Sequence, residues 1–132
     1  MTDTLRIVLD GHKAPSWNML YSGVHWSKRS AMKNDVTMAV RVALPDAVVN
    51  GEGYPYQVPV RIEVHAHYSG RMLDADNIVD KLYIDAIKGW VIEDDTPKYV
   101  VSAKTVPHKA KTNRVEIVVI PDIRQAEKEQ AK

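Results

Sequence analysis

The chain has 132 residues, the size of one ordinary domain, and no cysteine, which excludes disulfides and thiolate metal sites. No apolar run approaches the roughly 20 residues of a membrane helix, and the first residues lack the basic start of a signal peptide. The net charge is only +1, so composition alone does not indicate a nucleic-acid partner. We therefore predict a cytoplasmic protein with one domain over residues 1–121 and a polar tail over residues 122–132.

Four segments show the apolar alternation or short apolar runs typical of strands: residues 5–9, 60–68, 99–106 and 114–120. The second segment is the clearest, because its two faces differ in every position. One face carries Val60, Ile62, Val64, Ala66 and Tyr68. The other face carries Arg61, Glu63, His65 and His67.

Two segments have helical periodicity. The first helix is predicted to start at Ser27 or Ser30, either of which suits an N-cap, and to end near Leu44, because Pro45 stops it. Its apolar stripe consists of Met32, Val36, Ala39, Val40 and Ala43. The second helix is predicted over about residues 75–88, and its apolar face consists of Ile78, Val79, Leu82, Ala86 and Ile87.

The remaining segments are predicted to connect these elements. Residues 11–27 and 45–59 lack periodicity and predict loops, and Gly89 predicts the end of the second helix. The order strand, helix, strand, helix, strand, strand predicts an α+β domain with a small mixed sheet and two main helices. The broad apolar face of the second helix fits either the core of the domain or a dimer seam.

Acidic residues are concentrated at the two ends of the second predicted helix. Asp74 and Asp76 stand two apart, and Glu93-Asp94-Asp95 follows the helix. A helix from Asp76 to Ile87 advances the chain by roughly 16 Å at about 1.5 Å per residue. The extended stretch from Ile87 to Asp94 spans at most roughly 25 Å, so it is long enough to run back beside Asp74 and Asp76.

Carboxylates gathered in one place need a cation, and oxygen-only ligation indicates Mg²⁺ or Mn²⁺. The pattern predicts phosphodiester hydrolysis at a metal held by Asp74, Asp76 and one or both of Asp94 and Asp95. Lys81 would then neutralise charge on the phosphate or the leaving oxygen. In the alternative interpretation, Asp74 and Asp76 cap a helix, and residues 93–95 form a solvated turn.

Basic residues flank this acidic centre in two segments. The first holds Lys28, Arg29, Lys33 and Arg41, and the second holds Lys98, Lys104, Lys109, Lys111 and Arg114. Such flanks suit a metal-dependent enzyme acting on a polyanion, and they also fit a mixed solvated surface.

Histidine and tryptophan give two further candidates. His65 and His67 share a strand face at a spacing that can chelate a transition metal, but no third ligand is evident, which favours two exposed histidines. His65 is also a candidate neighbour of the acidic site, because its strand leads into it. Trp17, Trp26 and Trp90 either stack on bases or belong to the core or an interface, and the absence of Phe favours the second explanation.

Four stretches together carry a family resemblance, over about residues 5–120. They are Pro15-Ser16-Trp17-Asn18 followed by Lys28, Arg61-Ile62-Glu63-Val64-His65, Asp74-Ala75-Asp76-Asn77, and Asp85-Ala86-Ile87-Lys88-Gly89 running into Glu93-Asp94-Asp95. They resemble the N-terminal loop, the central strand, the D-x-D-N signature and the D-A-L…D-D segment of the RusA family of Holliday junction resolvases. These are small endodeoxyribonucleases of bacteria and phages.

The resemblance implies a RusA-like fold and a homodimer that nicks two strands of a four-way DNA junction during recombination and repair, with Mg²⁺ or Mn²⁺ as cofactor. It implies Asp74, Asp76 and Asp94 or Asp95 as catalytic carboxylates. The DNA contacts expected from both copies are Asn18, Lys28, Lys33, Arg71, Lys104, Lys109 and Lys111.

The lysine of the motif departs from the family pattern. The family's functional lysine stands four positions after the second Asp of the signature, where this chain has Asp80, and Lys81 comes one residue later. Either the helix carries a one-residue insertion or Lys81 is not the equivalent residue. Two alternatives therefore stand beside the resolvase: a junction-binding protein of this fold without strong catalysis, and a general nuclease with a bias for branched DNA.

Overall fold

The computed structural model describes residues 3–21 and 26–122, and within these ranges four strands form one sheet. The strands are β1 (Leu5–Asp10), β2 (Val60–Tyr68), β3 (Val100–Lys109) and β4 (Arg114–Pro121). Their order is β1-β4-β2-β3, with β4 antiparallel to both neighbours and β2 parallel to β3. The sheet is therefore mixed, as predicted, and each predicted strand lies within two or three residues of its observed bounds.

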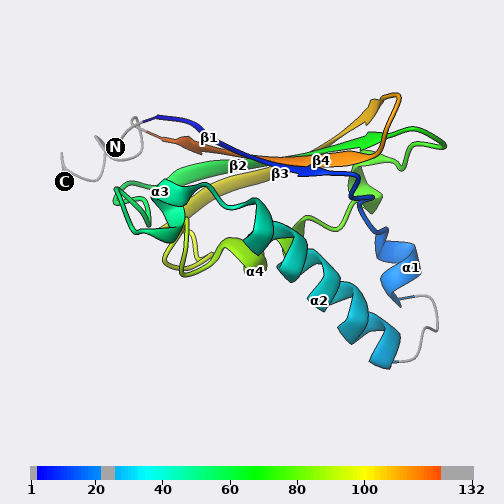
Figure 1. Cartoon of the computed structure of the whole chain (residues 1–132), viewed down its shortest axis with the longest axis horizontal. Coiled ribbons are helices and arrows are strands. Elements are labelled where there is room, and N and C mark those ends of the chain that lie inside the picture. Colours follow the sequence, from blue (N-terminus) through cyan, green and yellow to red (C-terminus); the bar gives the residue numbers. More distant parts are fainter. Residues whose placement is uncertain (1–2, 22–25, 123–132) are drawn as a thin grey trace.

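The helices cover one face of the sheet and leave the other face open (Figure 1). They are α1 (Trp17–Tyr21), α2 (Trp26–Ala43), α3 (Asp46–Val49), the 3-10 helix η1 (Ala75–Asn77) and α4 (Asp80–Ile87). The main helix α2 packs against both α4 and β1. The predicted α+β class is confirmed.

Alternation in the strands decides which face of the sheet the helices cover. In β2 the side chains of Val60, Ile62, Val64, Ala66 and Tyr68 are all buried, and the residues between them are not. Ile7 in β1 and Ile117 in β4 are buried on the same side. The hydrophobic effect therefore holds the helices to one face, and the polar side chains of β2 remain on the open face.

The predicted stripe of α2 is also observed. Val36 and Val40 are buried, and the partly buried side chains packed on the core include Met32, Ala39 and Ala43. The helix ends at Ala43, just before Pro45, as predicted. It begins at Trp26, however, so Ser27 and Ser30 lie inside the helix and the predicted N-caps are wrong.

Both predicted loops contain a short helix. In the segment predicted as a loop over residues 11–27, Ser16 Oγ accepts a hydrogen bond from the Met19 N–H at 2.9 Å, which caps α1, and Leu20 is buried. In the segment 45–59, α3 follows Pro45 and buries Val48. One buried side chain anchors each of these short helices to the core. Tertiary contact therefore stabilises them, and their sequences show no helical periodicity.

The predicted helix over residues 75–88 is interrupted. After η1, Ile78 adopts extended dihedral angles (φ −83°, ψ 129°), and α4 begins only at Asp80. Ile78 forms a β-bridge with Ser16, and the Val79 N–H donates to the Pro15 carbonyl at 3.4 Å. These bonds to the N-terminal loop replace the intrahelical bonds that a continuous helix would make.

The apolar face of α4 belongs to the core. Ile78, Val79, Leu82, Ala86 and Ile87 are all buried within the chain itself, so the interpretation as a dimer seam is wrong. In the part of the chain that the structure describes, no helix has the length and apolarity needed to span a bilayer. Of the polar tail predicted over residues 122–132, Asp122 belongs to the described residues, and residues 123–132 lie outside them.

Gly89 offers a test of the predicted helix stop. Its φ is +80°, and an added Cβ would contact nothing within 4 Å, so Gly89→Ala should lose about 1 kcal/mol of unfolding free energy through backbone strain alone. The matched control is Gly70→Ala, which also has open space but no positive φ and should change stability by less than about 0.5 kcal/mol. Urea denaturation of both variants measures the difference. Equal losses would contradict a conformational role for Gly89.

Candidate functional site

Two carboxylates lie at η1 on the helix side of the sheet: Asp74 directly precedes this 3-10 helix and Asp76 lies within it. Asp74 and Asp76 are exposed, and neither forms an ion pair with any residue of the described ranges 3–21 and 26–122. The Thr105 hydroxyl on β3 donates a hydrogen bond to the Ala75 carbonyl, which fixes the loop between them against the sheet. Two oxygen-donor side chains, two residues apart in the sequence, are therefore exposed and without a protein cation among the described residues.

The N-terminal loop docks onto this acidic loop. The Asn18 N–H donates to Asn77 Oδ1 at 3.1 Å, so the asparagine of the signature satisfies a free donor at the start of α1. The Ser16–Ile78 bridge lies two residues before Asn18 and one residue after Asn77. The structure thus brings Asn18, a predicted DNA contact, onto the acidic loop at Asn77, the residue that follows Asp76, and it gives Asn77 a positioning role that was not expected from the sequence.

An ion-pair chain runs along the exposed side of α4. Lys81 Nζ lies 3.5 Å from Asp85, and Lys88 Nζ lies 3.3 Å from both Asp85 and Asp95. Desolvation acts to lower the pKa of Lys88, but the hydrogen bonds and the charges of Asp95 and Asp85 together outweigh it and raise this pKa. Desolvation acts to raise the pKa of Asp95, but the hydrogen bonds with Lys88 and Asp94 outweigh this effect and lower the pKa. Asp95 is therefore an ionised carboxylate with a protein cation as its partner.

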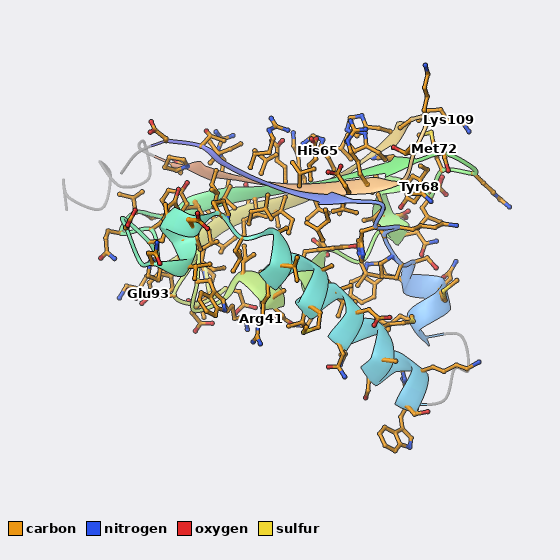
Figure 2. The ribbon with its side chains drawn as sticks, viewed as in Figure 1. Arg41, His65, Tyr68, Met72, Glu93 and Lys109 are labelled. Atoms are coloured by element: carbon orange, nitrogen blue, oxygen red, sulfur yellow. The ribbon has the colours of Figure 1, made fainter. Side chains whose placement is uncertain are left out.

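This chain of ion pairs separates the predicted metal ligands. Asp95 is held by Lys88 at the C-terminal end of α4, whereas Asp76 precedes the N-terminal end of the same eight-residue helix. Figure 2 shows Glu93 and Met72, which neighbour the two acidic segments in sequence, toward opposite ends of the molecule. Among the described residues, no three His, Cys, Asp or Glu side chains are arranged to hold a metal.

The expectation that Asp74 and Asp76 share one site with one or both of Asp94 and Asp95 is therefore not met. Its physical premise was a helix continuous from Asp76, followed by a return of the chain along it. Instead, the break at Ile78 shortens the helix, and the 3.3 Å pair with Lys88 keeps Asp95 at the far end. Asp94 is exposed, and its Oδ1 accepts the Asp95 N–H at 2.8 Å, which stabilises the turn.

The predicted basic residues fall into separate groups. Lys28 and Lys33 lie in the first half of α2, where Trp26, Arg29 and Lys33 line a hollow of about 230 Å³. Trp26 is 65% exposed, so the core interpretation is wrong for this tryptophan, whereas Trp17 and Trp90 do pack on the core. We call Trp26, Lys28, Arg29 and Lys33 the basic end of α2. It projects at the same end of the molecule as α1 and η1 (Figure 1).

The other predicted DNA contacts lie elsewhere. Lys104 pairs with Glu63 at 3.4 Å on the open face of the sheet, and Lys109 Nζ donates to the Gly70 carbonyl at 2.8 Å. Arg71 and Lys111 are exposed in the loops after β2 and β3. Lys81 is engaged with Asp85 on α4. The basic side chains therefore do not form one continuous face.

His65 and His67 lie on the open face, across the sheet from η1, because Thr105, which bonds η1, pairs in register with the buried Val64. The expectation that His65 neighbours the acidic site is wrong. A third histidine joins them: His108 Nε2 lies 2.8 Å from His65 Nδ1 and stacks on His67, its partner in the parallel register, at 4.5 Å. The register of β2 on β3 places His108 beside His67, and the sequence did not reveal this register.

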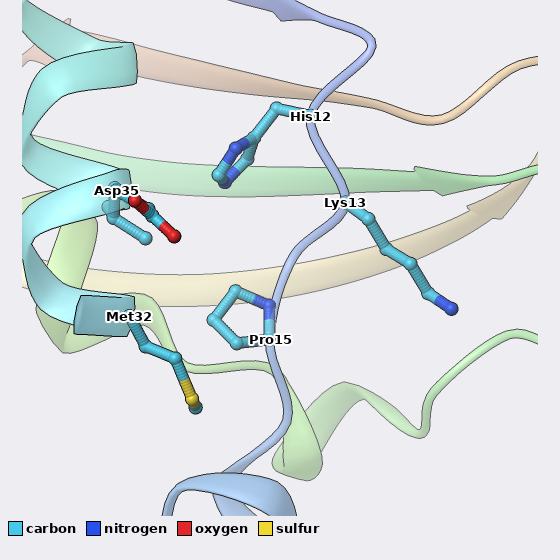
Figure 3. Close-up of a pocket in the computed structure, with 6 residues that line it drawn as sticks. His12, Lys13, Pro15, Met32 and Asp35 are labelled. Carbon is cyan, nitrogen blue, oxygen red and sulfur yellow. The ribbon is translucent and has the colours of Figure 1, made fainter. Parts of the chain in front are cut away.

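A small cavity of about 210 Å³ lies between the N-terminal loop and α2 (Figure 3). It is lined by His12, Lys13, Pro15, Met32, Asp35 and Val36. His12 Nε2 and the Tyr83 hydroxyl share a hydrogen bond of 2.8 Å, and burial raises the pKa of Tyr83. Burial also lowers the pKa of His12, although Asp35 opposes the shift. The pair acts as a polar tie between the N-terminal loop and α4.

Compared with known proteins, the chain matches no family model and no curated sequence.

The histidines predict a pH dependence of stability. The pKa of His108 is lowered from 6.5, first by desolvation and then by His67 and His65, and that of His12 is lowered by burial. Because these histidines have higher pKa values in the unfolded chain, the unfolded chain binds protons at a higher pH than the folded chain does. The free energy of unfolding should therefore fall as the pH drops from about 7.5 to about 5.5. Urea denaturation at both pH values measures it, and His108→Asn should reduce the slope. A slope unchanged in that variant would contradict the contribution of His108.

Proposed function

We propose that the chain is a metal-dependent endodeoxyribonuclease that acts on branched DNA, with four-way junctions as its substrate. The observation that carries the proposal is the pair of exposed carboxylates, Asp74 and Asp76, without a protein cation, beside Asn18 and at the same end as the basic end of α2. Two like charges on one short turn repel each other, so a divalent cation would lower their energy when it binds. The family resemblance of the motifs supports the same assignment.

The donor chemistry fits Mg²⁺ or Mn²⁺. Mg²⁺ sites commonly use one or two carboxylates and complete the coordination with water and substrate phosphate, so Asp74 and Asp76 are sufficient protein ligands. When bound, the metal supplies Lewis-acid polarisation of a phosphoryl oxygen and a water of lowered pKa. Asp95 is then an indirect contributor, since Lys88 already neutralises it.

The basic end of α2 would hold the DNA. Lys28, Arg29 and Lys33 supply charge for backbone phosphates, and the exposed ring of Trp26 supplies a surface on which an unstacked base can lie. Unstacked bases occur at the centre of a junction rather than in intact duplex. This combination therefore favours branched over continuous DNA.

A homodimer suits this substrate, because a junction presents two equivalent strands to two equivalent sites. Paired nicking of those strands would serve recombination and repair.

Cleavage of a labelled synthetic four-way junction in Mg²⁺ tests the proposal. Asp74→Asn and Asp76→Asn should each reduce the rate by at least about 100-fold, because each removes a metal ligand's charge. Asp95→Asn should reduce it less, by about tenfold or under, since Asp95 is paired with Lys88. Glu52→Gln, in an exposed loop, is the matched control and should cleave normally.

Three outcomes would contradict this assignment. Cleavage by Asp76→Asn at the wild-type rate would exclude the two-carboxylate site. A loss in Asp95→Asn as large as in Asp76→Asn would instead support the shared site that the sequence predicted. Equal cutting of junctions, flaps and duplex would favour a general nuclease.

A second candidate is a junction-binding protein of this fold without strong catalysis. The separation of Asp95 from Asp74 and Asp76 along α4 favours it, as does the engagement of Lys81 with Asp85. It predicts salt-dependent binding to junctions and no cleavage in either Mg²⁺ or Mn²⁺.

Binding itself has a separate test. Trp26→Ala should weaken binding to a junction by at least about tenfold, because stacking contributes roughly 1–3 kcal/mol per base, with little change in stability since the ring is 65% exposed. Val49→Ala, 51% exposed on α3, is the matched control and should bind normally. Fluorescence anisotropy in the presence of Ca²⁺ measures both. Unchanged affinity of Trp26→Ala would remove the basic end of α2 from the binding surface.

A further inference from the structure

Two histidines on the open face of the sheet point ring nitrogens at each other. His65 Nδ1 lies 2.8 Å from His108 Nε2, with the ring centroids 5.0 Å apart and the ring planes inclined by 22°. The residues belong to β2 and β3, so the backbone of a different strand holds each ring. Figure 2 shows His65 on the side of the sheet away from α2, where the described helices do not cover it. The pair is therefore within reach of a small ligand from solvent.

The carboxylate of Glu63 decides which nitrogen of His65 carries a lone pair. Glu63 Oε1 lies 2.8 Å from His65 Nε2, and an ionised carboxylate only accepts hydrogen bonds, so this nitrogen is the donor. In the neutral ring, Nδ1 then carries the lone pair, and it faces His108. A carboxylate behind a histidine is also the arrangement that orients metal-binding histidines in proteins.

His67 restrains the ring of His108 from a second direction. The two rings stack with centroids 4.5 Å apart and planes inclined by 12°, while His67 Nε2 lies 3.3 Å from Glu116 Oε2. His67 therefore presents its face to His108, and its Nε2 is engaged elsewhere. Within residues 3–21 and 26–122, no third His, Cys, Asp or Glu completes a metal-binding group with the pair.

We propose that His65 Nδ1 and His108 Nε2 bind a divalent transition-metal ion such as Zn²⁺, with water in its remaining coordination positions. Imidazole nitrogens suit Zn²⁺, Ni²⁺ and Cu²⁺, whereas Mg²⁺ takes oxygen ligands. Tetrahedral Zn²⁺ with ligands at about 2.0–2.1 Å places two nitrogens roughly 3.3 Å apart. The observed 2.8 Å is shorter by about 0.5 Å, so a small rotation of one ring admits the ion. The proton that His108 shares through Nε2 moves to its Nδ1, and both rings stay neutral.

The charges near the pair favour a coordinated metal over an anion. The basic side chains on this face already have carboxylate partners: Lys104 lies 3.4 Å from Glu63, and Arg6 and Arg114 lie 3.2 and 3.9 Å from Glu116. Because these carboxylates offset most of the basic charge, long-range attraction contributes little in either direction. Binding would come from the two coordinate bonds, which join β2 to the edge strand β3.

This site is independent of the proposed nuclease function, since it lies across the sheet from η1 and uses nitrogen ligands. Isothermal titration of the full chain, without an affinity tag, with Zn²⁺ in a large excess of Mg²⁺ tests it, because Mg²⁺ competes for carboxylates and not for imidazole. The wild type should bind one Zn²⁺ per chain. His65→Asn and His108→Asn should each weaken binding by at least about 100-fold, and Glu63→Gln, which removes the orienting carboxylate, by about tenfold.

Two histidine variants are the matched controls. His67→Asn removes a ring on the same face that only stacks, and it should weaken binding less than tenfold. His12→Asn, at the cavity on the helix side, should leave binding unchanged. Nitrogen NMR of the histidine rings should show that Zn²⁺ shifts Nδ1 of His65 and Nε2 of His108. Thermal melting of each variant separates loss of the ion from loss of the fold.

Three outcomes would overturn the inference. The first is the absence of saturable Zn²⁺ binding to the wild type. The second is a loss in His67→Asn as large as in His65→Asn, which would exclude the two-ligand arrangement. The third is a loss of Zn²⁺ binding in Asp76→Asn but not in His65→Asn, which would place the ion at the carboxylates of η1. Junction cleavage enters none of these measurements, so a failure here leaves the nuclease proposal to its own test.

Discussion

The docking of the N-terminal loop onto the acidic loop is the constraint on which the candidate site depends. Pro15, Ser16 and Asn18 take up the backbone and side-chain hydrogen bonds of residues 77–79, and in doing so they interrupt the helix that the sequence pattern favours. The cost is one lost turn of helix. The gain is a fixed loop in which the side chains of Asp74 and Asp76 are exposed, since Asp74 occupies the N-cap position of η1 without a side-chain cap bond.

The same docking explains why two distant parts of the chain belong to one surface. The cap on α1 comes partly from Asn77, and α1 precedes the basic end of α2 in sequence. The tie between His12 and Tyr83 then fixes the start of this loop to α4. Carboxylates, an asparagine and cations are thereby held at one end by hydrogen bonds rather than by direct ion pairs. Such a surface leaves its charges available to a ligand, which is the physical basis of the nuclease proposal.

How far the sequence predicts this protein depends on which interaction decides each element. The strands and α2 follow from periodicity, because burial against one face of the sheet selects the alternation in β2 and the stripe around Val36 and Val40. The short helices α1 and α3 depend on single buried residues, Leu20 and Val48, and on a cap, which leave little periodic signal. Ser16, a residue type that is preferred at N-caps, was nevertheless a readable sign of the start of α1.

The site was less predictable, because its geometry depends on contacts between residues far apart in sequence. A chain-length estimate allowed Asp95 to reach Asp76 but did not include Lys88, whose ammonium group offers Asp95 a nearer partner. The register of β3 on β2, which gathers three histidines on the open face, is equally absent from local pattern.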